Sequence, residues 1–223
     1  MKVIRPVFAL QAASLAIFFA GAVQAGDANA PAPAKMPPYS KQALQSKIEY
    51  CQTCHGVSAE GTRGSVPIPR LAGQQVKYLE NQLRNFILHR RVNNVMSNAV
   101  QQMGSAEMTA LAAYFYGLNP KPLGGAPRDL VDAGKKIYEE GIPETSVSAC
   151  ASCHGPEAKG EGVYPRLAGQ INEYVVNKLV NWDRERGRDP AVPAKSASAM
   201  KSVTHNLTNA QIAAVASYLN YLE

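Results

Sequence analysis

The pentapeptides Cys51-Gln-Thr-Cys54-His55 and Cys150-Ala-Ser-Cys153-His154 decide how this chain folds. The spelling C-x-x-C-H marks covalent attachment of haem c. Two thiols add to the vinyl groups of one porphyrin, and the adjacent imidazole becomes the proximal ligand of the iron. Two copies predict two covalent haem c groups, with His55 and His154 as metal ligands. A small chain that holds two haems is expected to carry electrons.

Three other uses of four cysteines are weaker alternatives. Disulfides are common in exported proteins, a C-x-x-C pair can be a redox centre, and clustered cysteines can bind zinc. A redox pair needs no histidine directly after it. Zinc would need further ligands, and the remaining histidines, His89 and His205, lie far from both clusters in sequence. The complete pentapeptide in both halves favours haem.

The first 25 residues are typical of a cleavable signal peptide. Lys2 and Arg5 precede an apolar run over residues 7–23, and small residues follow at the expected cleavage site. The run is at the lower length limit for a membrane span, so an uncleaved anchor is the alternative. Residues 26–38 are rich in alanine and proline and are expected to form a flexible leader. We therefore expect an exported protein of the periplasm.

The rest of the chain is a tandem duplication. The hexapeptide Pro-Arg-Leu-Ala-Gly-Gln at residues 69–74 recurs letter for letter at residues 165–170. The offset between the two copies changes along the chain, so insertions fall between the matched blocks, where loops belong. Two long units indicate a duplicated domain and not a solenoid. The expected boundaries are 39–119 for domain 1, 120–128 for a Pro/Gly-rich linker and 129–223 for domain 2.

Helical periodicity dominates both units, and no alternating apolar pattern predicts a sheet. Helices are expected before each pentapeptide, after each hexapeptide and at the end of each unit. The expected ranges of the first two kinds are 40–50, 74–86, 129–140 and 170–182. Ser105 and Asn209 are expected to cap the closing helices. The fold class is therefore all-α, with each small domain wrapped around one haem that supplies much of its core.

Met96 and Met200 are assigned as the sixth ligands of the two irons. Each lies 15 residues before a matched apolar position of the closing helix. Histidine/methionine ligation closes the iron and raises its potential. We expect both methionines in irregular segments that cross the distal haem face. Core packing is the alternative; a bis-histidine haem through His89 or His205 is weaker, because neither histidine has a counterpart in the other unit.

The repeated hexapeptide is expected to support the haem. A ligating imidazole usually donates its second N–H to a carbonyl, and the carbonyls of Pro69 and Pro165 are the predicted acceptors. Arg70 and Arg166 are predicted to pair with haem propionates through charge-assisted hydrogen bonds. A solvated loop position is the alternative for both arginines.

The positive charge of the mature chain lies in its first half. Residues 39–119 contain 8 basic and 4 acidic residues, whereas residues 120–223 contain 12 of each. A basic surface steers an acidic partner and makes association dependent on salt. A solvated surface without a partner is the alternative.

Together, the paired C-x-x-C-H motifs, the P-R-L-A-G-Q blocks, the methionines and the closing helices resemble dihaem cytochrome c4 over nearly the whole mature chain. The resemblance implies two tandem class I cytochrome c domains, related by a pseudo-twofold axis, with propionates facing each other and histidine/methionine ligation at both haems. It implies electron transfer in the periplasm, with peripheral association with the inner membrane. The implied partners are redox proteins: an upstream dehydrogenase or small carrier, and a terminal oxidase or other acceptor. No nucleic-acid partner and no catalytic residue is expected.

The alternative function is a dihaem redox enzyme of the peroxidase or thiosulfate dehydrogenase type, with one catalytic haem. Such an enzyme needs an open distal site and nearby acid–base residues. Only the charged loop 183–199 is conspicuously longer in one unit than in the other. One departure from the family concerns the crossing of first and last helices: Gly134 suits a close crossing, whereas the first unit offers only Ala43 or Ser46. We expect a wider crossing there.

Overall fold

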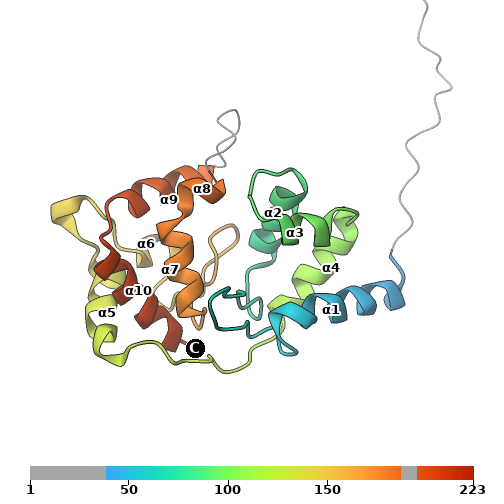
Figure 1. Ribbon diagram of the computed structural model, residues 1–223, viewed down its shortest axis with the longest axis horizontal. Helices are drawn as coiled ribbons and strands as arrows, with labels where there is room; N and C mark the ends of the chain where they lie inside the picture. Colours follow the sequence, from blue (N-terminus) through green and yellow to red (C-terminus); the bar gives the residue numbers. More distant parts are fainter. Residues whose placement is uncertain (1–38, 187–194) are drawn as a thin grey trace, which may run out of the picture. The chain divides into compact units, whose positions relative to one another are not determined.

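Every regular element in the described part of the chain, residues 39–186 and 195–223 of a computed structural model, is a helix (Figure 1). The predicted all-α class is confirmed. The first half holds α1 Lys41–His55, α2 Val76–Ile87, α3 Asn94–Val100 and α4 Ser105–Tyr116. The second half holds the 3-10 helices η1 Arg128–Leu130 and η2 Pro143–Thr145, with α5 Val131–Glu140, α6 Ala151–His154, α7 Asn172–Val180, α8 Trp182–Arg186, α9 Lys195–His205 and α10 Asn209–Tyr221.

All described residues belong to one compact unit. The predicted signal peptide, 1–25, and leader, 26–38, lie outside the described residues. Within the described ranges, no helix has the length and apolar character that crossing a bilayer requires.

The two pentapeptides lie in different helical settings. In the first half, α1 runs unbroken through the motif to His55 and ends at Gly56, whose φ of 90° closes the helix. In the second half, α5 ends at Gly141, where a β-carbon would lie 2.3 Å from the carbonyl oxygen of Val147. The chain then makes a tight loop, and the short helix α6 carries the second motif.

Three details of the helix predictions are wrong. The closing helices are capped one residue earlier than expected, by Gly104 and Thr208. Thr208 forms a capping box with Gln211: its hydroxyl accepts a hydrogen bond from the Gln211 N–H, and the Gln211 side chain accepts one from the Thr208 N–H. The helix expected over 170–182 is two helices, since α7 ends at Val180 and α8 follows.

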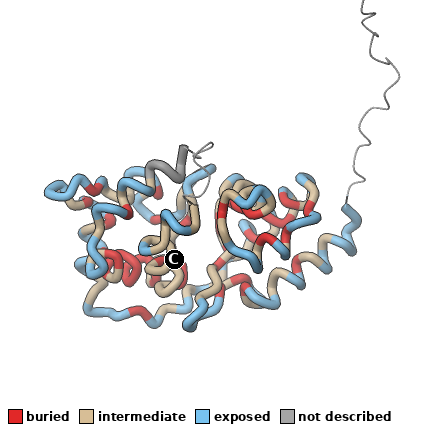
Figure 2. Tube along the Cα trace, turned by 45° about the horizontal axis from the view of Figure 1, so that its top comes forward, coloured by how far each residue is buried: buried red, intermediate tan, exposed pale blue. Residues whose placement is uncertain are grey.

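Each half buries its own apolar core (Figure 2). The first core packs the inner faces of α1, α2 and α4 together, with Leu111 and Phe115 at its centre. The second core packs α5, α7 and α10 together, and Tyr138 is completely buried there. The chain is thus folded twice in the same way, as the duplication predicts.

The first and last helices of the second half cross at Gly134. A β-carbon there would lie 2.0 Å from the carbonyl oxygen of Ala214, so the backbones of α5 and α10 touch. Ala43 and Ser46 are both exposed, so neither lies at a crossing in the first half. The neighbouring Leu44 is partly buried and packs against the core of the first half.

The hexapeptides of the two halves bind each other through reciprocal hydrogen bonds. The Gln170 side chain accepts from the backbone N–H of Arg70 at 2.8 Å and donates to the Arg70 carbonyl at 3.1 Å. The Gln74 side chain does the same with Arg166, at 2.8 and 2.9 Å. All four residues are buried. Buried backbone amides must be hydrogen-bonded, and here each half supplies the partner for the other.

Further contacts between the halves surround this pair. Arg63 forms an ion pair with Glu173 at 2.7 Å and also donates to the carbonyls of Gly124 and Gly125. On another element, the Arg91 guanidinium donates to the Tyr174 hydroxyl at 2.7 Å. The two halves are therefore held by polar groups at several separate points.

We expect Gly134→Ala to destabilise the protein even though alanine is the better helix former. The new β-carbon would overlap backbone atoms, and such overpacking costs about 1–3 kcal/mol. Chemical denaturation followed by circular dichroism measures the change. Gly117→Ala is the control, because its β-carbon would meet nothing closer than 3.5 Å. Equal loss of stability in both variants would contradict the close crossing.

Gln170→Ala is expected to lower the free energy of unfolding by about 1–3 kcal/mol, because it leaves the buried N–H groups of Arg70 and Ile171 without an acceptor. The measurement is the same denaturation experiment. In the control Gln45→Ala, an exposed side chain loses an exposed hydrogen bond to Glu49, and the change should stay within about 0.5 kcal/mol. A Gln170 variant as stable as the control would show that water replaces the contact.

Candidate haem sites

Each proximal histidine is fixed by a backbone carbonyl of the hexapeptide. His55 Nδ1 lies 2.8 Å from the carbonyl oxygen of Pro69, and His154 Nδ1 lies 2.9 Å from that of Pro165. A carbonyl can only accept, so Nδ1 carries the proton and Nε2 keeps its lone pair. Both predicted acceptors are confirmed. In both imidazoles the lone pair of Nε2 is therefore available to coordinate a metal.

Burial keeps both imidazoles neutral. His55 and His154 are each 6% exposed. Loss of solvation lowers the pKa of each histidine below its usual value, and the hydrogen bond to the proline carbonyl partly opposes this shift. A neutral imidazole is the form that binds metal, so the protein environment favours ligation at neutral pH.

In each motif one cysteine faces inward and the other faces solvent. Cys51 and Cys150 are partly buried and pack against the two cores, and burial raises the pKa of each thiol to about 11. Cys54 and Cys153 are exposed. None of the four forms a disulfide, and within the described ranges no group of three or more His, Cys, Asp or Glu side chains is placed to hold an ion such as zinc. The arrangement fits a porphyrin that is tethered at the core edge.

The loops after the two histidines share a hydrogen-bond pattern, although the second loop is shorter. The carbonyl of Ala59 accepts from the N–H groups of Leu71 and Ala72, and that of Ala158 accepts from the equivalent pair in the second half. Both alanines are completely buried, with φ of 56° and 54°. Such a backbone is costly for alanine, so the surroundings must enforce it. Sequence reasoning missed these alanines, although their match at the same offset as the haem motifs was the available signal.

The methionines are placed differently from the prediction. Met96 lies in the first turn of α3, where the Asn93 side chain accepts from its N–H at 3.0 Å, and Met200 lies within α9. The prediction that both methionines lie in irregular segments is therefore wrong. The backbone amides of both segments form helical hydrogen bonds instead. Both side chains are partly buried, and Met96 packs against the same core as Cys51.

Arg70 and Arg166 are buried, which excludes the solvated alternative. They are 3% and 7% exposed. Each Nε donates to a carbonyl two residues further on, at 3.1 Å. One terminal nitrogen in each guanidinium, Nη1 of Arg70 and Nη2 of Arg166, has no hydrogen-bond partner. A buried cation with an unsatisfied donor requires an anion, so the site fits a group that carries carboxylates, as haem does.

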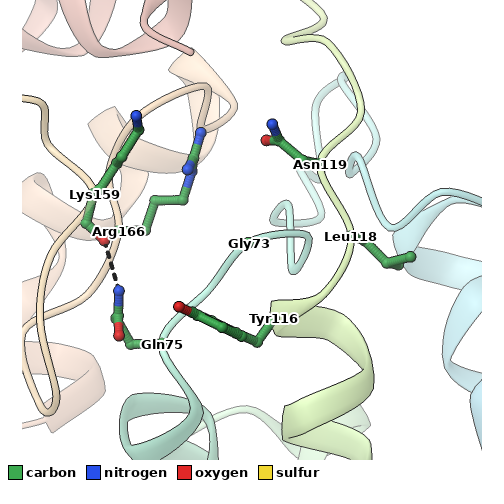
Figure 3. A pocket seen from close by; sticks show the side chains of 7 residues that line it. All are labelled: Gly73, Gln75, Tyr116, Leu118, Asn119, Lys159 and Arg166. Atoms are coloured by element: carbon green, nitrogen blue, oxygen red, sulfur yellow. Dashed lines mark hydrogen bonds between the residues drawn. The ribbon is translucent and has the colours of Figure 1, made fainter.

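The two arginines also affect each other. Burial, and next the positive charge of Arg166, lower the pKa of Arg70 to about 10, and burial lowers the pKa of Arg166. A cavity of about 180 Å³ opens beside Arg166, where residues of both halves meet (Figure 3). Figure 3 shows Lys159 next to Arg166 and Asn119 across the opening. An anion would be favoured in these surroundings.

One buried hydroxyl distinguishes the second site from the first. The Tyr138 hydroxyl donates to the carbonyl of Gly155, the residue after His154, at 2.5 Å. Burial raises the pKa of Tyr138, so the hydroxyl stays protonated. In the first half, the residue that α1 buries ahead of the motif is the apolar Ile48. Sequence reasoning missed this difference between the halves.

Comparison with known proteins agrees with this geometry. The family model for cytochrome c matches residues 131–223, and the model for subunit III of cbb3-type cytochrome c oxidase matches residues 41–115. Cytochrome c4 of Thiocapsa roseopersicina is 37% identical, over 77% of this chain and 86% of its own length. A protein of Thiomonas intermedia, named thiosulfate dehydrogenase electron acceptor, is 35% identical over 82% of each chain.

A solved structure shows the same fold. That of cytochrome c4 from Acidithiobacillus ferrooxidans matches with a TM-score of 0.68 and 33% identity, over 78% of this chain and 99% of the other. The chain has two cytochrome c domains, each with one C-x-x-C-H motif, and therefore holds two covalent haem c groups in total. The chain belongs to the dihaem cytochrome c4 family of electron carriers.

Proposed function

We propose that this protein passes electrons in the periplasm from an upstream dehydrogenase or small carrier to a terminal oxidase or other acceptor. The observation that carries this proposal is the pairing of the hexapeptides, because the segment that fixes each proximal histidine is hydrogen-bonded to its counterpart in the other half. An electron that enters at one site is therefore next to the second site. The relative named thiosulfate dehydrogenase electron acceptor supports a dehydrogenase as donor.

The proposed ligands are His55 with Met96, and His154 with Met200. When bound, haem c supplies an iron that changes valence by one electron. The chain contributes a neutral imidazole whose Nε2 is free, and a thioether that closes the opposite face. Neither group gains or loses a proton during the cycle. Closed ligation keeps substrates from the metal, which suits a carrier.

Arg70 and Arg166 would hold haem propionates, because each presents an unpartnered buried nitrogen. The functional units are 39–119 and 129–223, joined by 120–128, after a signal peptide at 1–25 and a leader at 26–38. Peripheral association with the inner membrane would keep the carrier near its partners.

A dihaem enzyme remains the second candidate, and no specific observation favours it. The name of the Thiomonas relative describes the acceptor of a thiosulfate dehydrogenase, which is the role of a carrier. High-spin haem features or consumption of peroxide by the purified protein would support the enzyme instead. Two low-spin haems without peroxide turnover support the carrier.

Met96→Ala and Met200→Ala are each expected to remove about half of the sulfur-to-iron charge-transfer band of the oxidised protein and to lower one midpoint potential, because each deletes one of two thioether ligands. Absorption spectroscopy and potentiometric titration measure both effects. Met103→Ala and Met108→Ala are matched controls, since both methionines are buried core residues. They should lose stability and keep the full band. A full band in Met200→Ala would show that another residue binds the iron.

Reduction by a partner with an acidic docking surface should slow as ionic strength rises, because the first half carries the excess of basic residues. Stopped-flow mixing with a purified thiosulfate dehydrogenase and thiosulfate measures the rate. An uncharged small reductant is the control and should show little dependence on salt. A rate that is insensitive to salt for both would remove the proposed steering.

A further inference from the structure

We infer that Arg70 and Arg166 form one shared cationic bridge, through which each half of the molecule sets the midpoint potential of both haems. This inference rests on the proposed function and deepens it. In a simpler arrangement, each arginine would serve only the haem of its own half. The contacts of the two side chains favour sharing.

Each guanidinium reaches across to the hexapeptide of the other half. A β-carbon added at Gly73 would lie 3.3 Å from Cδ and 3.4 Å from Nη1 of Arg166. A β-carbon added at Gly169 would lie 3.4 Å from Nη1 of Arg70. The guanidinium of each arginine therefore contacts a glycine of the other half. Glycine at both positions leaves room for the incoming side chain.

Hydrogen bonds fix the side chain and the backbone of both arginines. Each Nε is bound to a carbonyl of its own half, and the backbone of each arginine is bound by the glutamine of the other half. Arg70 Nη2 also reaches the Asn119 side-chain oxygen at 3.4 Å. Two fixed cations in a buried region act over a longer range than surface charges, because little water screens them.

Neither cation is fully neutralised by the protein, because the negative charge of Glu60 only partly offsets the effects that lower the pKa of Arg70. Within the described ranges, no carboxylate forms an ion pair with Arg70 or Arg166, and the two charges repel each other. Each guanidinium keeps one buried terminal nitrogen without a partner, Nη1 in Arg70 and Nη2 in Arg166. Their positive charge therefore acts on whatever is bound at both haem sites.

The sign of the effect follows from charge balance. Reduction of a haem adds one electron, breaks no bond and lowers the local positive charge by one. A nearby buried cation favours the reduced form and raises the midpoint potential. If the bridge is shared, removal of either arginine lowers both potentials.

The test is potentiometric titration of the dihaem protein with Arg166→Gln and Arg70→Gln. Each variant is expected to lower both midpoints, on the order of tenfold in the one-electron reduction constant, which corresponds to ~59 mV. Arg63→Gln is the matched control: Arg63 also links the halves, but its side chain is 38% exposed, so both midpoints should stay near those of the wild type. Movement of a single midpoint, of neither, or an equal effect in Arg63→Gln would overturn the bridge.

Arg166→Lys keeps the inference testable if the glutamine variants fail to fold. Lysine retains the charge but loses it at a lower pH than arginine does. Both midpoints of this variant should fall with rising pH beyond any fall in the wild type, and a fall of one midpoint alone would contradict the inference. The oxidised spectra separate this outcome from failure of the proposed function, since an intact charge-transfer band shows that both ligand sets persist.

Discussion

The structure depends on one requirement: buried backbone amides must find hydrogen-bond partners. The hexapeptides lie between the halves, where water is excluded, and the glutamine of each one bonds the arginine backbone of the other. The same hexapeptide, through its proline carbonyl, orients the histidine of its own half. Six residues therefore join the halves and align the metal ligand, which explains why this block recurs unchanged.

The duplicated motifs were sufficient to predict the all-α class, both haems and the carbonyl partners of His55 and His154. These features depend on residue type and spacing, which a sequence displays directly. The sequence could not show that Met96 and Met200 lie on helices, because tertiary packing decides where a short polar segment becomes helical. Nor could it show that each arginine contacts the hexapeptide of the other half, since spacing along the chain does not reveal contacts between distant segments.

The two halves share a path but differ in detail. The Tyr138 hydroxyl donates to the carbonyl of Gly155, the residue after the second histidine, whereas the residue that α1 buries ahead of the first motif is the apolar Ile48. Gly134 allows a close helix crossing in the second half. Two copies of one domain thus provide two unequal surroundings for the same cofactor, and such differences are the means by which a protein adjusts redox potentials.

The unbroken first helix has a mechanical consequence. Because α1 contains 15 residues and ends in the haem motif, it is a stiff rod about 22 Å long. A displacement at Lys41 would be transmitted along this rod to His55. In the second half, the loop between α5 and α6 separates the leading helix from the helix that carries His154.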